Sequence, residues 1–238
     1  MHNCLVGSEM CIRDRTHRYL GLFLGIQFLF WTVSGLYFSW TNLDEIHGDQ
    51  FKKIDVNHTE FSGLISPSML DLKNPIKFLE LREIDSHPYY FINNKVLYNA
   101  IDGKKKMEID EKEAVKIANK YIREDLKVSY VEKINETGPH HEYRERLLPA
   151  YVISYDTKDN LKAYVSTIDG RFQTVRHRNW RWFDFLWMTH TMDYEGRDDF
   201  NNEILRAFSL LGLITVMSGF LLWFVSSKTI RRIKSFFQ

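Results

Sequence analysis

The sequence predicts an α+β fold in which two transmembrane helices flank an extracytoplasmic domain of helix plus antiparallel sheet units. Three observations predict it: two long apolar segments without a charged residue, a polar segment between them, and a strand-and-turn pattern that occurs twice in that polar segment. The average composition conceals this division, because 26% charged residues and a mean hydropathy of −0.34 are typical of a soluble protein. The balance of 32 basic and 31 acidic residues excludes nucleic-acid binding driven by bulk charge.

Residues 1–18 are expected to form a cytoplasmic N-terminus. Within them, the stretch VGSEMCIRDR resembles translated read-through of a sequencing adapter, and residues 1–15 have neither helical nor strand periodicity. We therefore expect residues 1–15 to be a sequencing artefact and the natural protein to begin near Thr16. Both cysteines, Cys4 and Cys11, lie in this stretch, so we assign them no redox or metal chemistry.

The two apolar segments, residues 19–40 and 207–225, are predicted to be transmembrane helices. They are 22 and 19 residues long, and about 20 helical residues cross a hydrocarbon core of about 30 Å. The alternative for both is a buried helix of a soluble protein, but such helices are shorter and usually carry a polar stripe. The alternative for the first is a signal peptide, but the run is too long and no small-x-small cleavage site follows Trp40.

The distribution of basic residues predicts the orientation of the two spans. Arg18 precedes the first span, and the tail at 226–238 carries four basic residues and no acidic one. Because basic residues beside a span stay in the cytoplasm, both termini are predicted to be cytoplasmic. Residues 41–206, with 25 basic and 29 acidic residues, then form a periplasmic domain at a bacterial inner membrane.

The central segment has both helix and strand patterns. Asp110 is a predicted N-cap and Glu113 completes a capping-box spacing, so a helix is expected within 109–123. Four apolar residues then follow at i, i+3, i+4 and i+7 on one helical face: Ala114, Ile117, Ala118 and Tyr121. Strands are expected at 128–131, 150–155 and 162–168.

A pattern of two strands followed by Ile-Asp-Gly and a basic residue occurs twice. The first copy runs from Tyr89 to Lys104 and the second from Tyr151 to Arg171. The Asp-Gly pair suits a tight turn because glycine accepts a positive φ. A short helix within 66–72 is expected to accompany the first copy. The central domain is therefore predicted to contain an internal repeat.

At these residues the sequence resembles a family. A helix that begins Asp-x-x-x-Ala, followed by AYVISYDTKDNLKAYVSTIDGRFQTV, is similar to a PepSY domain over residues 109–177, and residues 64–105 resemble a degenerate second copy. The segments His17–Gly21, Ser34-Gly35 and Leu186–His190 resemble PepSY-associated transmembrane proteins. The resemblance covers nearly all of the chain after residue 15.

The resemblance implies two different functions. Soluble PepSY modules accompany the propeptides of thermolysin-like peptidases and restrain or assist them, whereas some membrane members resemble haem-containing reductases of siderophore-bound iron. The chain has no His-Glu-x-x-His motif, so it is not itself a peptidase of that kind. We expect a non-enzymatic, membrane-anchored binding or regulatory module that acts on a peptidase or another envelope protein.

The alternative is a haem-binding component of ferric-siderophore or iron reduction, with His17 and His190 as the candidate ligands. The spans themselves contain no histidine, and these two histidines flank opposite ends of the membrane, about 30 Å apart. They could share one haem only as symmetric pairs in a homodimer, His17 with His17 or His190 with His190. We favour the reading without haem and commit to no cofactor, metal ligand or catalytic residue.

Three further segments receive structural interpretations. Residues 180–192 are rich in aromatic side chains and are predicted to form a helix at the outer membrane interface, in contact with the lipid bilayer. The acidic cluster at 193–203 is expected to pair with nearby arginines and to stabilise the start of the second span. His140, His141 and Glu142 are interpreted as an exposed loop, because they do not fix a metal geometry.

Four glycines predict how the two spans pack. Gly25 and Gly219 lie at similar depths near the inner edge, and Gly35 and Gly212 lie at similar depths near the outer edge. We expect an antiparallel helix pair that packs through these two glycine pairs. The alternative is that glycine is merely common in membrane spans.

Overall fold

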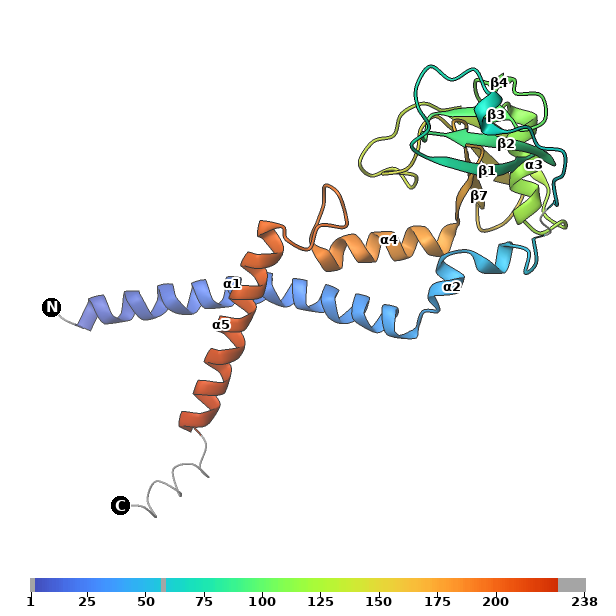
Figure 1. Ribbon diagram of the computed structural model, residues 1–238. Coiled ribbons are helices and arrows are strands. Elements are labelled where there is room, and N and C mark those ends of the chain that lie inside the picture. The colour runs from blue at the N-terminus through green and yellow to red at the C-terminus, as the bar shows by residue number, and fades with distance from the viewer. Residues whose placement is uncertain (1–2, 57–58, 227–238) are drawn as a thin grey trace, which may run out of the picture. The chain divides into compact units, whose positions relative to one another are not determined.

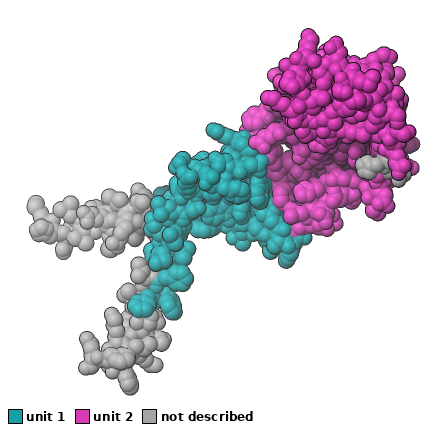
Figure 2. All heavy atoms as spheres, in the orientation of Figure 1, with its two compact units in different colours: residues 1–40, 185–238 teal, residues 41–184 magenta. Residues whose placement is uncertain are grey.

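A computed structural model describes residues 3–56 and 59–226 of the chain (Figure 1). The chain divides into two compact units, one of residues 41–184 and the other of residues 1–40 with 185–238 (Figure 2). We call them the sheet unit and the helical unit and describe each by itself. The sheet unit ends at residue 184, and the assignment of residues 41–206 to one extracytoplasmic domain stays a prediction.

The sheet unit holds two antiparallel sheets of four strands each, which confirms an α+β fold. The first sheet has the order β1-β2-β3-β4, with strands Leu79–Ile84, His87–Ile92, Val96–Asn99 and Lys105–Lys106. The second has the order β5-β6-β7-β8, with strands Val128–Ile134, Ala150–Tyr155, Lys162–Ser166 and Phe172–Arg176. The helix α3, Glu111–Tyr121, lies between them in sequence.

The repeat predicted from the sequence corresponds to these two sheets. In each, the turn that joins the third strand to the fourth contains the Asp-Gly pair, and both Gly103 and Gly170 have a positive φ, of 73° and 63°. The helix expected in residues 66–72 is a single 3-10 turn, Pro67–Met69, whose N-cap Ser66 accepts a hydrogen bond from Ser68. The first copy therefore keeps the sheet of the second but has no equivalent of its helix.

The main core lies where α3 covers the second sheet and where one face of the first sheet joins it. α3 packs on β6, β7 and β8 through the apolar face predicted from its sequence. From the first sheet, Ile84, Phe91 and Leu97 enter the same core. The alternate residues Tyr90 and Ile92 point to the opposite face, where Leu70 and its neighbours cover them.

The helical unit contains three helices: α1, Asn3–Trp40; the C-terminal half of α4, Arg178–Thr191; and α5, Glu203–Ser226. Two of its segments, residues 21–40 and 203–220, are long and apolar enough to cross a membrane. α1 begins at Asn3, so a continuous helix precedes the first apolar segment where the sequence shows no periodicity. The predicted basic tail lies outside the described residues from residue 227 onward.

Two short helices follow α1 at the start of the sheet unit: α2, Leu43–Ile46, and a 3-10 turn, Asp49–Phe51. Asn42 caps α2 by accepting a hydrogen bond from the Asp44 N–H. Ile46 is 2% exposed, and the His177 ring is bonded to the Ile46 carbonyl. This segment is thereby fixed to the end of β8.

Candidate functional site

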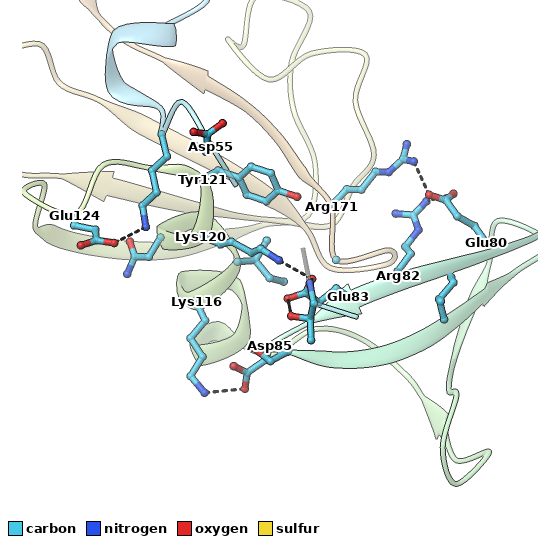
Figure 3. Close-up of a pocket in the computed structure, with 17 residues that line it drawn as sticks. Asp55, Glu80, Arg82, Glu83, Asp85, Lys116, Lys120, Tyr121, Glu124 and Arg171 are labelled. Atoms are coloured by element: carbon cyan, nitrogen blue, oxygen red, sulfur yellow. Dashed lines mark hydrogen bonds and ion pairs between the residues drawn. The ribbon is translucent and has the colours of Figure 1, made fainter. Parts of the chain in front are cut away.

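A large cleft in the sheet unit lies where β1 of the first repeat faces α3 of the second (Figure 3). We call it the inter-repeat cleft. It has a volume of about 870 Å³ and is lined by five acidic and five basic side chains. They come from β1 and the turn after it, from α3 and the segment after it, from the segment before β1 and from the turn before β8: Lys53, Asp55, Glu80, Arg82, Glu83, Asp85, Lys116, Lys120, Glu124 and Arg171.

The capping box of α3 determines which residues face this cleft. The Asp110 side chain accepts the N–H of Glu113, and the Glu113 side chain accepts the N–H of Asp110, as the sequence predicted. With the helix start fixed, the apolar residues face the core. Lys116 and Lys120, one turn apart, then lie toward β1.

Ion pairs connect the two sides of the cleft. Lys116 is 2.7 Å from Asp85 and Lys120 is 2.6 Å from Glu83, so α3 is bonded to β1 and to the turn that follows it (Figure 3). A third contact joins the repeats through Arg171, whose guanidinium is 2.8 Å from Glu80. The charged groups are therefore held in place before any ligand binds.

Arg82 lies at the base of the cleft and makes the most buried of these ion pairs. Its side chain is 8% exposed and its Nη1 is 3.0 Å from Asp169 Oδ2, which is 3% exposed. Its Nη2 is 2.9 Å from Glu80, and its guanidinium stacks on Phe91 at 4.5 Å. Asp169 belongs to the Asp-Gly turn of the second repeat, so the repeated motif is also a contact between the repeats.

Two carboxyl groups of the cleft, Glu80 and Glu83, have a pKa below the ordinary value. Burial raises the pKa of the Glu83 carboxyl, but hydrogen bonds from Lys120 and Thr59 outweigh burial, so this pKa lies below its ordinary value. Burial also raises the pKa of Glu80, and the charges and hydrogen bonds of Arg82 and Arg171 lower it further than burial raises it. The cleft thus presents fixed charges of both signs.

One edge of the cleft is an unpaired strand edge. β1 pairs with β2 on one side, and no strand in the described part of the chain pairs with its other side. Leu81, at the centre of β1, is 43% exposed and lines the cleft. A free strand edge offers backbone N–H and C=O groups to an added strand, and fixed charges beside it can select the side chains of that strand.

His190, a candidate haem ligand, lies in the helical unit beside the first apolar segment. Its Nδ1 is 2.7 Å from Ser34 Oγ, and its ring packs edge-on against Phe38 at 5.6 Å between centroids. Two more side chains of α1 donate to the end of α4: Gln27 to the Thr189 carbonyl and Trp31 to the His190 carbonyl. Burial lowers the pKa of His190, which favours the neutral imidazole.

The structure does not bring His190 together with another histidine among the described side chains. The side chain of His17 lies outside them, so its distance from His190 stays a prediction. No group of three or more His, Cys, Asp or Glu residues capable of holding a metal ion occurs in the described part of the chain.

The four glycines do not meet as expected. Gly212 faces the ring of Phe28 rather than Gly35. Among the described residues, no atom lies within 4 Å of a Cβ built on Gly25, Gly35 or Gly219. The contacts between α1 and α5 include aromatic side chains, with Phe23 and Phe208 5.0 Å apart between centroids. Large rings therefore fill the space where the prediction placed close backbone contact.

The helix predicted at 180–192 is α4, and its position relative to a membrane stays a prediction.

The interpretation of Glu142 as part of an exposed loop is wrong, because Arg181 binds this carboxylate at 2.6 Å and the buried Tyr164 donates to it at 2.7 Å. The cluster at 193–203 pairs Arg206 with Glu203 as expected. Asp193 accepts N–H groups of its own loop, and Asn202 caps α5.

Comparisons with protein-family models, with curated proteins and with solved structures found no match for this chain.

Sequence reasoning did not find the inter-repeat cleft, because β1 was not predicted as a strand. Its alternation, Leu-Glu-Leu-Arg-Glu-Ile, places a charged residue, Arg82, at a buried position. The contact of His190 with Ser34 was also missed. Its signal was the spacing of Gln27, Trp31 and Ser34 at i, i+4 and i+7, a polar face within an apolar segment.

Proposed function

We propose that this chain is a membrane-anchored, two-repeat PepSY-like protein that binds an extended polypeptide segment of an envelope partner in the inter-repeat cleft. Binding there regulates the partner, which is a peptidase or another secreted protein. The two apolar helices serve as the anchor, both termini lie in the cytoplasm, and the sheet unit lies outside the inner membrane.

The observation that carries this proposal is the position of the unpaired edge of β1 beside fixed charges of both signs. An added strand would gain backbone hydrogen bonds along β1. Its charged side chains could then exchange with Lys116 or Asp85 at the exposed end, where solvent weakens the ion pair and makes it easy to replace. The buried pair of Arg82 and Asp169 would keep the two repeats in register.

The test is site-specific photocrosslinking in cells with a photoreactive amino acid at Leu81. We expect discrete adducts with an extracytoplasmic protein, which mass spectrometry identifies, and a several-fold loss of these adducts when Lys116→Glu is added. Ile101, which is 52% exposed in the turn after β3, is the matched control position. Adducts of equal yield at both positions, or none at Leu81, would contradict the proposal.

A second measurement separates binding from regulation. The partner recovered from the adduct is purified, and its activity is measured with and without the full-length chain in lipid nanodiscs. We expect the wild-type chain to change that activity and Lys116→Glu to weaken the change. Lys95→Glu, an exposed substitution away from the cleft, should behave like wild type.

The contact between His190 and Ser34 supports one alternative, a haem-binding role in ferric-iron reduction. A hydrogen bond at Nδ1 orients the ring, as in many histidine ligands, and leaves Nε2 as the nitrogen that would bind iron. This environment fits one axial ligand, and the second would come from His17 or from His190 of a second copy. Bound haem would supply one-electron chemistry. An absorbance band in the haem region that disappears in His190→Ala and persists in His140→Ala would favour this role over the first.

A further inference from the structure

A second cleft in the sheet unit lies on the other side of Tyr121 and has a different charge. It has a volume of about 540 Å³ and lies between the 3-10 turn at 49–51, the end of β8 and the first turn of α4. We call it the arginine cleft. Its charged lining comprises Lys52, Arg146 and Arg176 against Asp49. These side chains leave an excess of two positive charges in a domain that is acidic as a whole.

Arg176 is the buried cation of this cleft. The residue is 9% exposed, and its guanidinium stacks on the Trp180 ring at 3.9 Å. Its Nε donates to the Glu142 carbonyl, and its Nη1 donates to Thr174 Oγ1 and to the Val175 carbonyl. All of these acceptors are uncharged. Among the described residues, no carboxylate lies within 4.0 Å of this guanidinium.

The nearest carboxylates are already bound to other cations. Glu142 is held by two nitrogens of Arg181 and by the Tyr164 hydroxyl. Asp184 is held by Arg144 at 2.8 Å. Both carboxylates therefore act on Arg176 only at longer range, and neither makes an ion pair with its guanidinium.

Arg146 adds a second guanidinium that has no carboxylate partner among the described residues. It is exposed at the rim and donates only to the Gln173 carbonyl, at 3.2 Å, in the described part of the chain. The pKa of Arg176 is lowered to about 10. Burial is the main cause and the positive charge of Arg146 acts in the same direction, while the charges of Glu142 and Asp184 act in the opposite one. Two guanidinium groups that line one cleft, neither in contact with a carboxylate of the described residues, would be stabilised by an anion bound between them.

We propose that the arginine cleft binds a phosphate group, either of a soluble phosphate compound or of a lipid headgroup. Arg146 and the remaining Nη2 of Arg176 would donate to the phosphate oxygens, since guanidinium groups match the geometry of phosphate. A dianionic phosphate balances the excess of two positive charges, which a single carboxylate does not. The half-buried rings of Trp180 and Phe172 line the same cleft and would pack against the group esterified to the phosphate.

The test is a titration of inorganic phosphate against the full-length chain in phosphate-free detergent, at constant ionic strength with chloride as the reference anion. We expect phosphate to bind and to raise the thermal unfolding midpoint. Both Arg146→Gln and Arg176→Lys should weaken phosphate binding at least tenfold. Arg146→Gln changes an exposed residue, so it still tests the site if the Arg176 variant fails to fold.

The control variant is Arg178→Gln. Arg178 is exposed and donates to the Lys158 carbonyl, as Arg146 does to Gln173, but it does not line the cleft. An equal loss of phosphate binding in this control, no loss in Arg146→Gln, no binding above chloride, or equal binding of acetate would overturn the proposal.

Short-chain phosphatidic acid distinguishes the two sources. Displacement of inorganic phosphate by dihexanoyl phosphatidic acid, and not by dihexanoyl phosphatidylcholine, would identify a lipid headgroup. Retention of phosphate in both cases would identify a soluble phosphate compound. The arginine cleft shares only Tyr121 with the inter-repeat cleft, so failure of either proposal leaves the other standing.

Discussion

Gly48 requires glycine for two reasons: its backbone conformation and the side chain packed against it. Its φ is 79°, and a Cβ at this position would collide with the Val175 side chain, beside His177. The absence of a side chain lets the segment after α2 lie directly on β8. Gly48 lies between α2 and the 3-10 turn at 49–51, so it determines where this segment packs on β8.

We predict that Gly48→Ala lowers the free energy of unfolding by roughly 2–4 kcal/mol, the cost of a strained φ plus overpacking. Urea denaturation of the full-length chain in detergent measures this loss. The matched control is Gly63→Ala, which has a φ of 71° but open space among the described residues. It should cost only about 1 kcal/mol. Equal losses in the two variants would show that contact with Val175 is unimportant.

His177 predicts a pH dependence of stability. Burial lowers its pKa below the ordinary value of 6.5, although the hydrogen bond with the Ile46 carbonyl acts in the opposite direction. The unfolded chain therefore takes up a proton near pH 6.5 while the folded chain does not. The contribution of this residue to stability is present above pH 6.5 and is lost as the pH falls below it, by up to about 1.4 kcal/mol per pH unit.

We expect His177→Gln to flatten the fall in unfolding free energy between pH 7 and pH 5, since glutamine can donate to Ile46 but does not titrate. Urea denaturation at a series of pH values measures the slope. His140→Gln, in an exposed loop, is the control and should keep the wild-type slope. An unchanged slope in His177→Gln would refute the assignment.

At the scale of elements, the two repeats are joined by a buried ion pair. Arg82 of β1 and Asp169 of the turn before β8 are both less than 10% exposed. Removal of Arg82 leaves the buried Asp169 carboxylate without its cation, and removal of Asp169 leaves Arg82 with Glu80 as its remaining ion pair. Arg171 with Glu80 makes a more exposed pair between the same two sheets, and such pairs contribute little.

We predict that Arg82→Met and Asp169→Asn each destabilise the sheet unit by roughly 3 kcal/mol, and that the double variant costs less than the two losses added together. A double-mutant cycle from urea denaturation gives the coupling. Arg171→Gln should cost less than about 1 kcal/mol. Strict additivity of the two buried substitutions would mean that the pair does not hold the repeats together.

Local signals in the sequence were enough to predict α3, the strands β6 and β7 and the two Asp-Gly turns. Each depends on residues close together in the chain, such as Asp110 with Glu113 in the capping box. β1 and the inter-repeat cleft could not be predicted this way. Their charged residues find partners far along the chain, as Arg82 does in Asp169, and only the packing of one repeat on the other determines that contact.

In the helical unit, too, local sequence signals predicted the helices but not the contacts between them. Length and hydropathy are properties of a segment, so the two apolar helices could be predicted from composition. Which residues of α1 and α5 touch depends on side-chain shape. Phe28 fills the position opposite Gly212 that the prediction gave to Gly35.

At the scale of the whole molecule, the average composition is typical of a soluble protein because two apolar helices and a charged domain between them are averaged together. We interpret the chain as a domain of two sheet repeats that the helices hold at the outer face of a membrane. In this account both clefts open to the extracytoplasmic side. The orientation of the chain therefore decides which partners can reach them.

Labelling of single cysteines in spheroplasts tests this central claim most directly. Cys4 and Cys11 are first replaced by serine, and one cysteine is then placed at residue 16, 95 or 238 through Thr16→Cys, Lys95→Cys or Gln238→Cys. We predict that a membrane-impermeant maleimide labels Lys95→Cys in intact spheroplasts and labels the other two variants only after permeabilisation. Labelling of residue 16 or 238 in intact spheroplasts, protection of residue 95, or loss of residue 16 from the mature membrane-bound chain would contradict the account.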